Sequence, residues 1–250
     1  MSNELDGKVA IVTGAGRNIG RAIALTLAEG GASILVNARS SRAEAETVVR
    51  EIEAAGGSAL VHIGDVADPK AVQAMADAAL RQFGRIDILV NNAALRREKS
   101  FAEMEYAEWR EILDVTLDGA FHCTKACLAG LRKSQAGTIV NIGGLSAHTG
   151  ARNRAHVVTA KAGIVGLTRA LASEFAADGI TVNCVVPGLI GTPRAKDKPE
   201  PAHHLTHQTL TGDRGRPEDV AAVVRFLCSA GARYVTGQAI HANGGAYLGT

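Results

Sequence analysis

Strand-like and helix-like segments alternate along almost the whole 250-residue chain, and this alternation limits the folds open to it. Each of the first six strand-like runs is followed by a segment with helical periodicity. The predicted strands are 8–12, 33–37, 59–63, 86–90, 138–142, 180–186 and 238–241. The predicted helices are 18–28, 41–55, 69–83, 106–132 and 156–176, with one more beginning at Pro217. Repeated strand–helix units predict an α/β fold with a doubly wound, mostly parallel, seven-stranded sheet and helices on both faces.

The composition and the lack of internal boundaries indicate one large core. Hydrophobic residues make up 46% of the chain and aromatic residues only 4%, so the core is expected to consist mainly of Ala, Val, Leu and Ile. No linker or repeat divides the sequence, which predicts a single domain over residues 1–250. One polar stretch with three prolines breaks the regular pattern. We predict a substrate lid there, near residues 189–216, with an ordinary surface loop as the alternative.

Charge and cysteine content exclude several classes of partner. A formal net charge of +2 argues against a nucleic-acid or anionic-membrane partner, and no long basic run occurs. The four cysteines form no Cys-x-x-Cys pair, which is typical of reduced cytosolic thiols. No apolar run reaches membrane-spanning length, and no leader-like segment begins the chain. We therefore expect a cytoplasmic protein.

The first predicted strand runs directly into a glycine-rich turn, Thr13-Gly14-Ala15-Gly16-Arg17-Asn18-Ile19-Gly20, which precedes the first helix. Glycines here let the backbone turn sharply and approach a pyrophosphate, while the helix presents unpaired N–H groups and the positive end of its dipole. This placement is typical of a Rossmann-type dinucleotide site. The residues expected to hold the phosphates are Gly14, Gly16, Arg17, Asn18, Ile19 and Gly20.

The end of the second predicted strand indicates which dinucleotide is bound. Sites for NAD commonly carry an acidic residue there, which binds the ribose hydroxyls, whereas this chain has Ala38. Arg39 and Arg17 are placed to reach a 2′-phosphate, and Ser40 can add a hydrogen bond. One charge-assisted hydrogen bond is worth about 1.5–3 kcal/mol. Two arginines therefore favour NADP(H), with NAD(H) as the alternative.

Further motifs resemble the short-chain dehydrogenase/reductase family, in particular its 3-oxoacyl-carrier-protein reductases, over essentially the whole chain. Beside the glycine-rich turn they are Asp65-Val66, Asn91-Asn92-Ala93-Ala94, Asn141-Ile142, Lys161, Pro187-Gly188, and the tail from Thr236 to Gly245. For the adenosine half of the coenzyme, the resemblance implies contacts from Asp65, Val66, Asn92 and Ala93. For the nicotinamide half, it implies contacts from Lys161, Pro187, Gly188, Ile190 and Thr192. It also implies a homotetramer.

The catalytic positions are where this sequence departs from that family. The family pattern has a Tyr four residues before the Lys, a Ser thirteen residues before that Tyr, and an Asn on the long preceding helix. Here these positions hold Val157, Gly144 and Thr116. Val and Gly have no proton to give, and general acid catalysis usually contributes about 10²–10⁴-fold. Ordinary ketone reduction therefore requires another proton donor.

Three functions fit this pattern. The first is an NADP(H)-dependent oxidoreductase that acts on a small carbonyl, hydroxyl or activated C=C substrate, with a relocated acid or base. The second is a non-redox reaction such as an elimination or epimerisation on the same scaffold. The third is a dinucleotide-binding member that is catalytically inactive.

The candidate catalytic residues for the first function are Lys161, His148, His156 and Ser146. Histidine titrates near neutral pH and suits proton transfer. His148 and Ser146 lie in a loop predicted after the strand 138–142, and His156 directly precedes Val157. The 2,4-dienoyl-CoA reductases, in the same family, also lack the usual Tyr and carry a Tyr at the position of Ser146.

Metal and serine-hydrolase chemistry find little support in the sequence. His203 and His207 are one helical turn apart, with His204 between them, but no carboxylate or cysteine lies close by to complete a zinc site. We expect no metal, and predict that these histidines touch substrate or are solvated. No Gly-x-Ser-x-Gly elbow occurs, which argues against an α/β-hydrolase.

Overall fold

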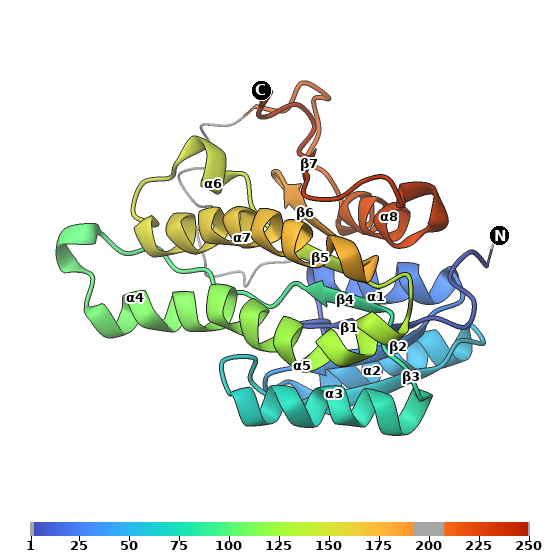
Figure 1. The fold of residues 1–250 in the computed structure, drawn as a ribbon. Helices are drawn as coiled ribbons and strands as arrows, with labels where there is room; N and C mark the ends of the chain where they lie inside the picture. Colours follow the sequence, from blue (N-terminus) through green and yellow to red (C-terminus); the bar gives the residue numbers. More distant parts are fainter. Residues whose placement is uncertain (1–2, 193–207, 250) are drawn as a thin grey trace.

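The computed structural model describes residues 3–192 and 208–249, whose helices and strands are shown in Figure 1. Seven strands in this part of the chain form one sheet in the order β3-β2-β1-β4-β5-β6-β7, and every neighbouring pair is parallel. The strands are β1 (Val9–Val12), β2 (Ser33–Ala38), β3 (Ala59–Ile63), β4 (Ile88–Asn91), β5 (Thr138–Ile142), β6 (Thr181–Pro187) and β7 (Ala239–Ala242). The predicted doubly wound α/β fold is confirmed, because the strand order reverses beside β1.

Helices connect these strands. They are α1 (Asn18–Glu29), α2 (Arg42–Ala54), α3 (Pro69–Phe83), α4 (Tyr106–Leu113), α5 (Gly119–Lys133), α6 (Ser146–Thr149), α7 (Ala155–Glu174) and α8 (Pro217–Cys228). Helix α3 has the bounds predicted from the sequence, because local signals fix both of its ends. The Asp68 carboxylate accepts a hydrogen bond from the Lys70 amide at 2.9 Å, Pro69 opens the helix, and Gly84 ends it with a φ of +79°.

Two predictions about the segments around the sheet's carboxyl edge are wrong in detail. The single helix predicted over 106–132 is interrupted by a π-helical turn, Asp114–Asp118, between α4 and α5. The loop predicted after residue 142 contains α6. A π turn and a one-turn helix are both too short to alter hydrophobic periodicity measured over a longer window.

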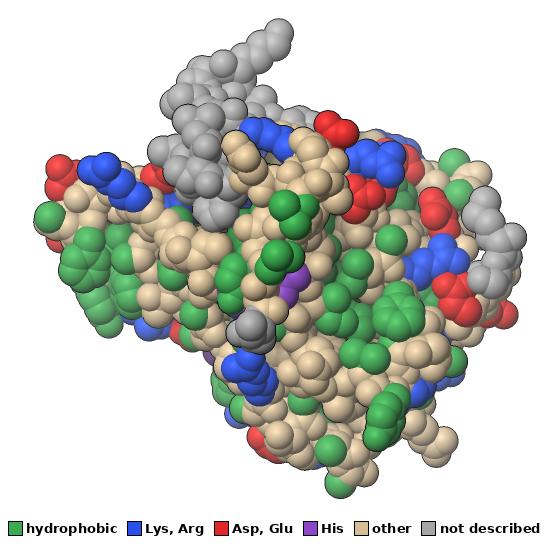
Figure 2. Space-filling model, turned by 90° about the horizontal axis from the view of Figure 1, so that it is seen from above, with side chains coloured by type: hydrophobic (Ala, Val, Ile, Leu, Met, Phe, Trp, Pro, Cys, Tyr) green, Lys and Arg blue, Asp and Glu red, His purple; other side chains and the backbone are tan. Residues whose placement is uncertain are grey.

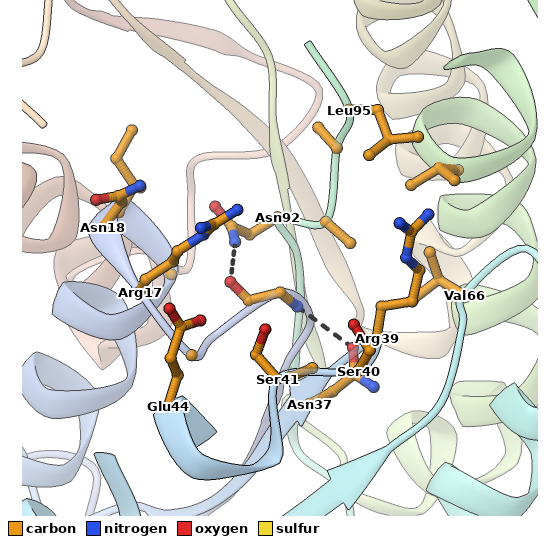
Figure 3. Close-up of a pocket in the computed structure, with 18 of the residues that line it drawn as sticks. Arg17, Asn18, Asn37, Arg39, Ser40, Ser41, Glu44, Val66, Asn92 and Leu95 are labelled. Atoms are coloured by element: carbon orange, nitrogen blue, oxygen red, sulfur yellow. Dashed lines mark hydrogen bonds between the residues drawn. The ribbon is translucent and has the colours of Figure 1, made fainter. Parts of the chain in front are cut away.

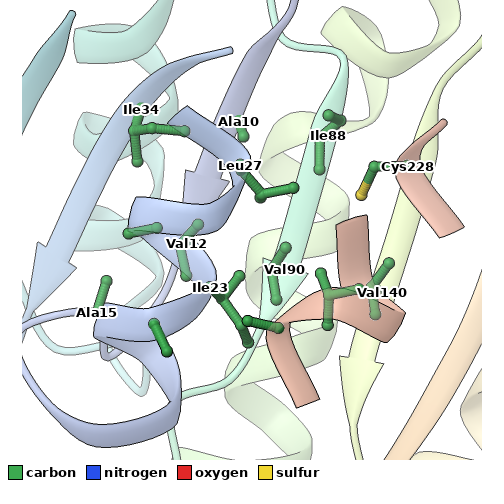
Figure 4. Close-up of a cluster of buried hydrophobic side chains, with 14 of the residues drawn as sticks. Ala10, Val12, Ala15, Ile23, Leu27, Ile34, Ile88, Val90, Val140 and Cys228 are labelled. Carbon is green, nitrogen blue, oxygen red and sulfur yellow. The ribbon is translucent and has the colours of Figure 1, made fainter. Parts of the chain in front are cut away.

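Both faces of the sheet are covered by helices, so alternate residues of its central strands enter different cores. Ala10 and Val12 belong to a core formed with α1, α2 and α8, whereas Ile11 between them packs with α3 and α5. Figure 4 shows the first of these cores, in which Ile23 and Leu27 of α1 lie over the sheet. The rigid sheet that results holds the carboxyl ends of its strands in fixed positions.

The surface carries basic and acidic side chains in mixed groups. On the face drawn in Figure 2, Lys and Arg side chains lie beside Asp and Glu side chains around the edge, with apolar side chains between them. This mixture agrees with the small net charge. Within residues 3–192 and 208–249, no helix has the length and apolar character needed to cross a bilayer.

Candidate functional site

A cavity of about 420 Å³ opens at the carboxyl ends of β1, β2 and β4 (Figure 3). Its walls come from the turn after β1, the start of α2, and the segments that follow β3 and β4. Many of the residues predicted for the dinucleotide line it: Gly14, Gly16, Arg17, Asn18, Ile19, Gly20, Arg39, Ser40, Asp65, Val66, Asn92, Ala93 and Thr192. The structure therefore brings together residues expected at the adenosine and phosphate half of the coenzyme with Thr192, which was expected at the nicotinamide half.

Side chains at the ends of two neighbouring strands hold the glycine-rich turn in place. The Thr13 hydroxyl accepts hydrogen bonds from the backbone amides of Asn92 and Ala93, both at 3.0 Å. In return, the Asn92 side-chain Nδ2 donates hydrogen bonds to the backbone carbonyls of Thr13 at 2.8 Å and Gly14 at 3.0 Å. Asn37 of β2 accepts from the Gly14 amide at 3.3 Å. Asn92 is thus a positioning residue for the turn, which is tied to β2 and β4 before any ligand arrives.

The geometry of this turn requires glycine at two positions, 14 and 20. Gly14 has a φ of +62°, a conformation that other residues rarely adopt. A Cβ atom at Gly20 would lie 2.3 Å from the Gly14 carbonyl oxygen and 2.5 Å from the Asn92 side-chain nitrogen. Asn18 also has a positive φ, of 51°, which Asn tolerates better than most residues. Because Gly14 and Gly20 have no side chains, the backbone of this turn can border the cavity directly.

The amino end of α1 faces this turn. Arg17 precedes the helix in extended backbone, and its side chain does not cap the first N–H groups. The first turn of α1 contains no acidic residue. Uncapped N–H groups together with the helix dipole make this end suitable for an anion such as a pyrophosphate.

The cavity is also lined by two residues with guanidinium groups, Arg17 and Arg39, and by Ser40. Arg39 lies 4.0 Å from Asp65, and both side chains are partly exposed. An exposed ion pair of this length contributes little energy, so it does not prevent Arg39 from binding a phosphate.

Lys161 lies outside this cavity, buried between α7 and β5. It is 6% exposed, and its Nζ donates to the Ile142 carbonyl at 2.5 Å. Burial, and then the positive charge of Arg96, lower the pKa of Lys161 to about 7. The Cγ of Lys161 is 3.7 Å from where a Cβ of Gly144 would lie. The structure thus places Lys161 against the position that holds Ser in the family pattern.

The other two catalytic positions of the family are buried and offer no acid. Val157 is 4% exposed and packs in a small apolar cluster with Ile112 and Ala160. Thr116 lies in the π turn, and its hydroxyl is buried without a hydrogen-bond partner among the described residues. The wall beside Lys161 is therefore largely apolar.

His148 forms a cluster of rings with two residues that the sequence analysis did not select. Its ring centroid is 4.6 Å from that of His241 and 5.4 Å from that of Tyr247, and the latter two lie 5.1 Å apart. The His148 Nε2 is buried and makes no hydrogen bond within the described part of the chain. Burial lowers the pKa of both imidazoles, so both are mainly neutral at pH 7.

The remaining predicted residues lie on the β5–β6 side of the sheet. His156 is 1% exposed, and its pKa is lowered mainly by burial; Arg154, Glu108 and Arg97 also affect it. His156 therefore faces the α4 side. Ser146 begins α6, which is tied to β6 because the Leu145 amide donates to the Pro187 carbonyl at 3.1 Å.

The segment after β6 connects these residues to the end of the chain. The Gly188 amide donates to Ala242 at 3.0 Å, and Ile190 pairs with Gly215 in an isolated parallel bridge. Of the predicted lid, residues 193–207 lie outside the described residues, and with them His203, His204 and His207. Pro187, Gly188 and Ile190 do not line the cavity.

Sequence reasoning missed several residues that line the cavity, among them Asn37, Ser41, Glu44, Leu95 and Arg96. One signal was available for Glu44: Ser41 and Glu44 have the spacing of a helix capping box, which places Glu44 in the first turn after β2. Arg96 follows β4 in a segment without a recognisable motif, and only the fold shows that this segment borders the cavity. The ring partners of His148 are separated from it by more than ninety positions, so no local pattern could identify them.

Comparison with known proteins agrees with this geometry. Residues 14–247 match the family described as enoyl-(acyl carrier protein) reductase. The chain is 40% identical over 245 residues to the 3-oxoacyl-(acyl-carrier-protein) reductase FabG of Staphylococcus aureus, covering 96% of this chain and 98% of the relative. It is 39% identical to the protein of the same name from Vibrio cholerae, over 98% and 99% of the two chains.

A solved structure has the same fold. A short-chain dehydrogenase from Burkholderia cenocepacia J2315, crystallised in complex with NADP, superposes with a TM-score of 0.90 at 34% identity, over 97% of this chain and 99% of the other. Both the sequence likeness and the structural likeness extend over nearly the full length. The chain therefore belongs to the short-chain dehydrogenase/reductase family and is similar to its 3-oxoacyl-(acyl-carrier-protein) reductases.

Proposed function

We propose that the chain is an NADP(H)-dependent oxidoreductase that acts on a small carbonyl, hydroxyl or activated C=C substrate with an unusual proton donor. One observation carries the proposal. The residues for a dinucleotide line one cavity and Lys161 holds its family position, while Val157 and Gly144 leave that wall without an acid.

The choice of NADP(H) rests on the charges of the cavity. Arg17 and Arg39 can both pair with a 2′-phosphate, and Ser40 can donate to it. The structurally similar Burkholderia protein was crystallised with NADP. The turn after β1 would hold the pyrophosphate, and Lys161 would bind the nicotinamide ribose next to Pro187, Gly188, Ile190 and Thr192.

His148 is the proton donor that the geometry favours among the candidates. Its ring is half-buried on α6, at the carboxyl edge shared by β5 and β6, and its Nε2 has no hydrogen bond to another described residue. His156 is more deeply buried and faces α4. Ser146, in the same turn as His148, has a hydroxyl that can bind a substrate oxygen but does not titrate near neutral pH.

The proposed division of labour follows from these positions. When bound, NADPH supplies a hydride to the substrate carbon. Protonated His148 gives its proton to the carbonyl oxygen, or to the carbon of an activated C=C bond, and the neutral imidazole takes it back in the reverse reaction. Lys161 holds the ribose, and the apolar wall of Val157 keeps water from the reacting atoms.

A second function, dinucleotide binding without redox turnover, has one observation in its favour. Val157 and Gly144 remove the usual donors beside Lys161, and the Lys161 Nζ is bound to the Ile142 carbonyl. Such a protein would serve as a sensor or assembly subunit, or would support an elimination or epimerisation.

Oxidation of NADPH, measured across a panel of small ketones, enals, imines, 3-oxoacyl thioesters and enoyl thioesters, separates these functions. The proposal predicts turnover of at least one class, lowered by about 10²-fold or more in His148→Asn. His156→Gln is the matched control and should retain most of the activity. Saturable NADPH binding with no turnover on any member of the panel would instead support the second function.

A further inference from the structure

Glu44 places a negative charge in a cavity whose other charged groups are suited to phosphate. It is the third residue of α2 and lines the cavity together with Arg17, Ser40 and Ser41. Figure 3 shows its carboxylate on the side of the cavity where Arg17 and Ser41 lie. A carboxylate beside a phosphate site needs an explanation, because like charges repel.

The Glu44 side chain lies close to the backbone of the glycine-rich turn at Gly16. A Cβ atom at Gly16 would lie 3.4 Å from the Glu44 Cβ and 3.7 Å from its Oε2. Gly16 is buried, and both Gly16 and Glu44 line the cavity. The Glu44 carboxylate therefore lies beside the glycine-rich turn that is expected to hold the coenzyme.

The local sequence predicts a different position for the Glu44 side chain from the one observed. Ser41 and Glu44 have the spacing of a capping box, in which the glutamate would turn back to the amide of the helix cap. Helices α4 and α8 form such boxes, through Glu108 and Asp219. In α2, by contrast, the Ser41 side chain makes no cap hydrogen bond. The Glu44 carboxylate lies beside the turn instead.

The two coenzymes differ at the atom that such a carboxylate would meet. The 2′-hydroxyl of NAD(H) is a hydrogen-bond donor, and an acidic residue commonly accepts its bond. The 2′-phosphate of NADP(H) is negatively charged and pairs with arginine. The end of β2 has Ala38 where the usual acid would stand, and Glu44 supplies a carboxylate from the next helix.

We propose that Glu44 sets the coenzyme preference of this chain. Its carboxylate accepts a hydrogen bond from the 2′-hydroxyl of NAD(H) and repels the 2′-phosphate that Arg17 and Arg39 attract. The chain then binds both coenzymes, and its preference for NADP(H) is smaller than the two arginines alone would give. This inference rests on the proposed dinucleotide site but not on any proposed proton donor.

The test is a titration of NADPH and NADH into the wild-type chain, Glu44→Gln and the control Glu53→Gln, which removes the same charge from the far end of α2. In Glu44→Gln, the Kd for NADPH should fall about two- to fivefold, as expected for an exposed charge pair. The Kd for NADH should rise about tenfold through loss of a charge-assisted hydrogen bond. Glu53→Gln should leave both values unchanged.

The outcomes separate the failure of this inference from that of the proposed function. If both coenzymes bind and Glu44→Gln leaves the ratio of the two Kd values unchanged or shifts it toward NADH, the role of Glu44 is wrong while the site stands. If neither coenzyme binds the wild-type chain, the inference and the dinucleotide site both fail.

Discussion

Val157 and Gly144 form an apolar wall beside Lys161, and this wall determines what the remaining residues must do. Val157 packs against Ile112 and Ala160, and Gly144 leaves open the space next to the Lys161 Cγ. A carbonyl substrate held there would meet no hydroxyl from either position. In the proposed reaction, the half-buried ring of His148 supplies the proton instead.

The pH dependence of turnover tests His148 directly. Burial, and to a smaller extent the charge of Arg169, lower the pKa of His148 below its usual value of 6.5. In the proposed mechanism reduction requires the protonated ring, so kcat/KM for reduction should fall about tenfold per pH unit above that pKa. Oxidation, which requires the neutral ring, should rise with pH and then level off. Identical profiles for the wild-type chain and His148→Asn would rule out this assignment.

The lowered pKa of Lys161 leads to a separate prediction, on how the free energy of unfolding changes with pH. Its pKa is about 7 in the folded chain, against a usual 10.5, so the unfolded chain binds more protons between these values. Its contribution to the free energy of unfolding therefore rises with pH, by about 1–2 kcal/mol from about pH 7 to about pH 8.5. Urea unfolding without coenzyme should show a less positive slope with pH for Lys161→Met. Comparing the two slopes cancels the contributions of Cys123 and Cys228, whose raised pKa values act in the opposite direction.

The turn between β1 and α1 is the element on which coenzyme binding depends most. In Gly20→Ala, the added Cβ would lie 2.3 Å from the Gly14 carbonyl oxygen, so the turn must move away from its position. We expect at least a tenfold loss of NADPH affinity, or about 1.4 kcal/mol, together with a lower melting temperature. Gly231→Ala is the control, since its Cβ would meet Ser229 and Phe226 at ordinary distances of 3.5 and 3.8 Å. Equal NADPH affinity in both variants would contradict this account of the turn.

The elements that could be predicted from the sequence are those fixed by local chemistry. Helix α3 has a cap residue, a proline and a terminal glycine within its own segment, and the glycine-rich turn carries its own signature. By contrast, α6 and the π turn arise where chain segments meet at the sheet's carboxyl edge. Glu44 lies beside Gly16, which is almost thirty residues earlier in the chain. Such contacts exist only once the sheet has formed.

Over the whole molecule, several large aromatic side chains are exposed on the single chain. Phe101 and Tyr106 are about three-quarters exposed beside α4, and Phe226 of α8 is half exposed near the fully exposed Tyr234. Contiguous apolar patches mark interaction surfaces, whereas single exposed side chains are common, so the tetramer prediction rests on the family resemblance. We predict a homotetramer, with a solution mass near four times the 25.9 kDa of one chain. Light scattering coupled to size-exclusion chromatography would contradict this if it gave the mass of one chain.

The proposed function depends on a dinucleotide that is held by the turn after β1 and by the guanidinium groups of Arg17 and Arg39. Isothermal titration of NADPH and NADH into the wild-type chain and an Arg17→Ala, Arg39→Ala double variant is the most direct test. Saturable binding of one NADPH per chain is expected, and the double variant should lose at least about tenfold in affinity. Flat isotherms for both coenzymes with the wild-type chain would contradict the account.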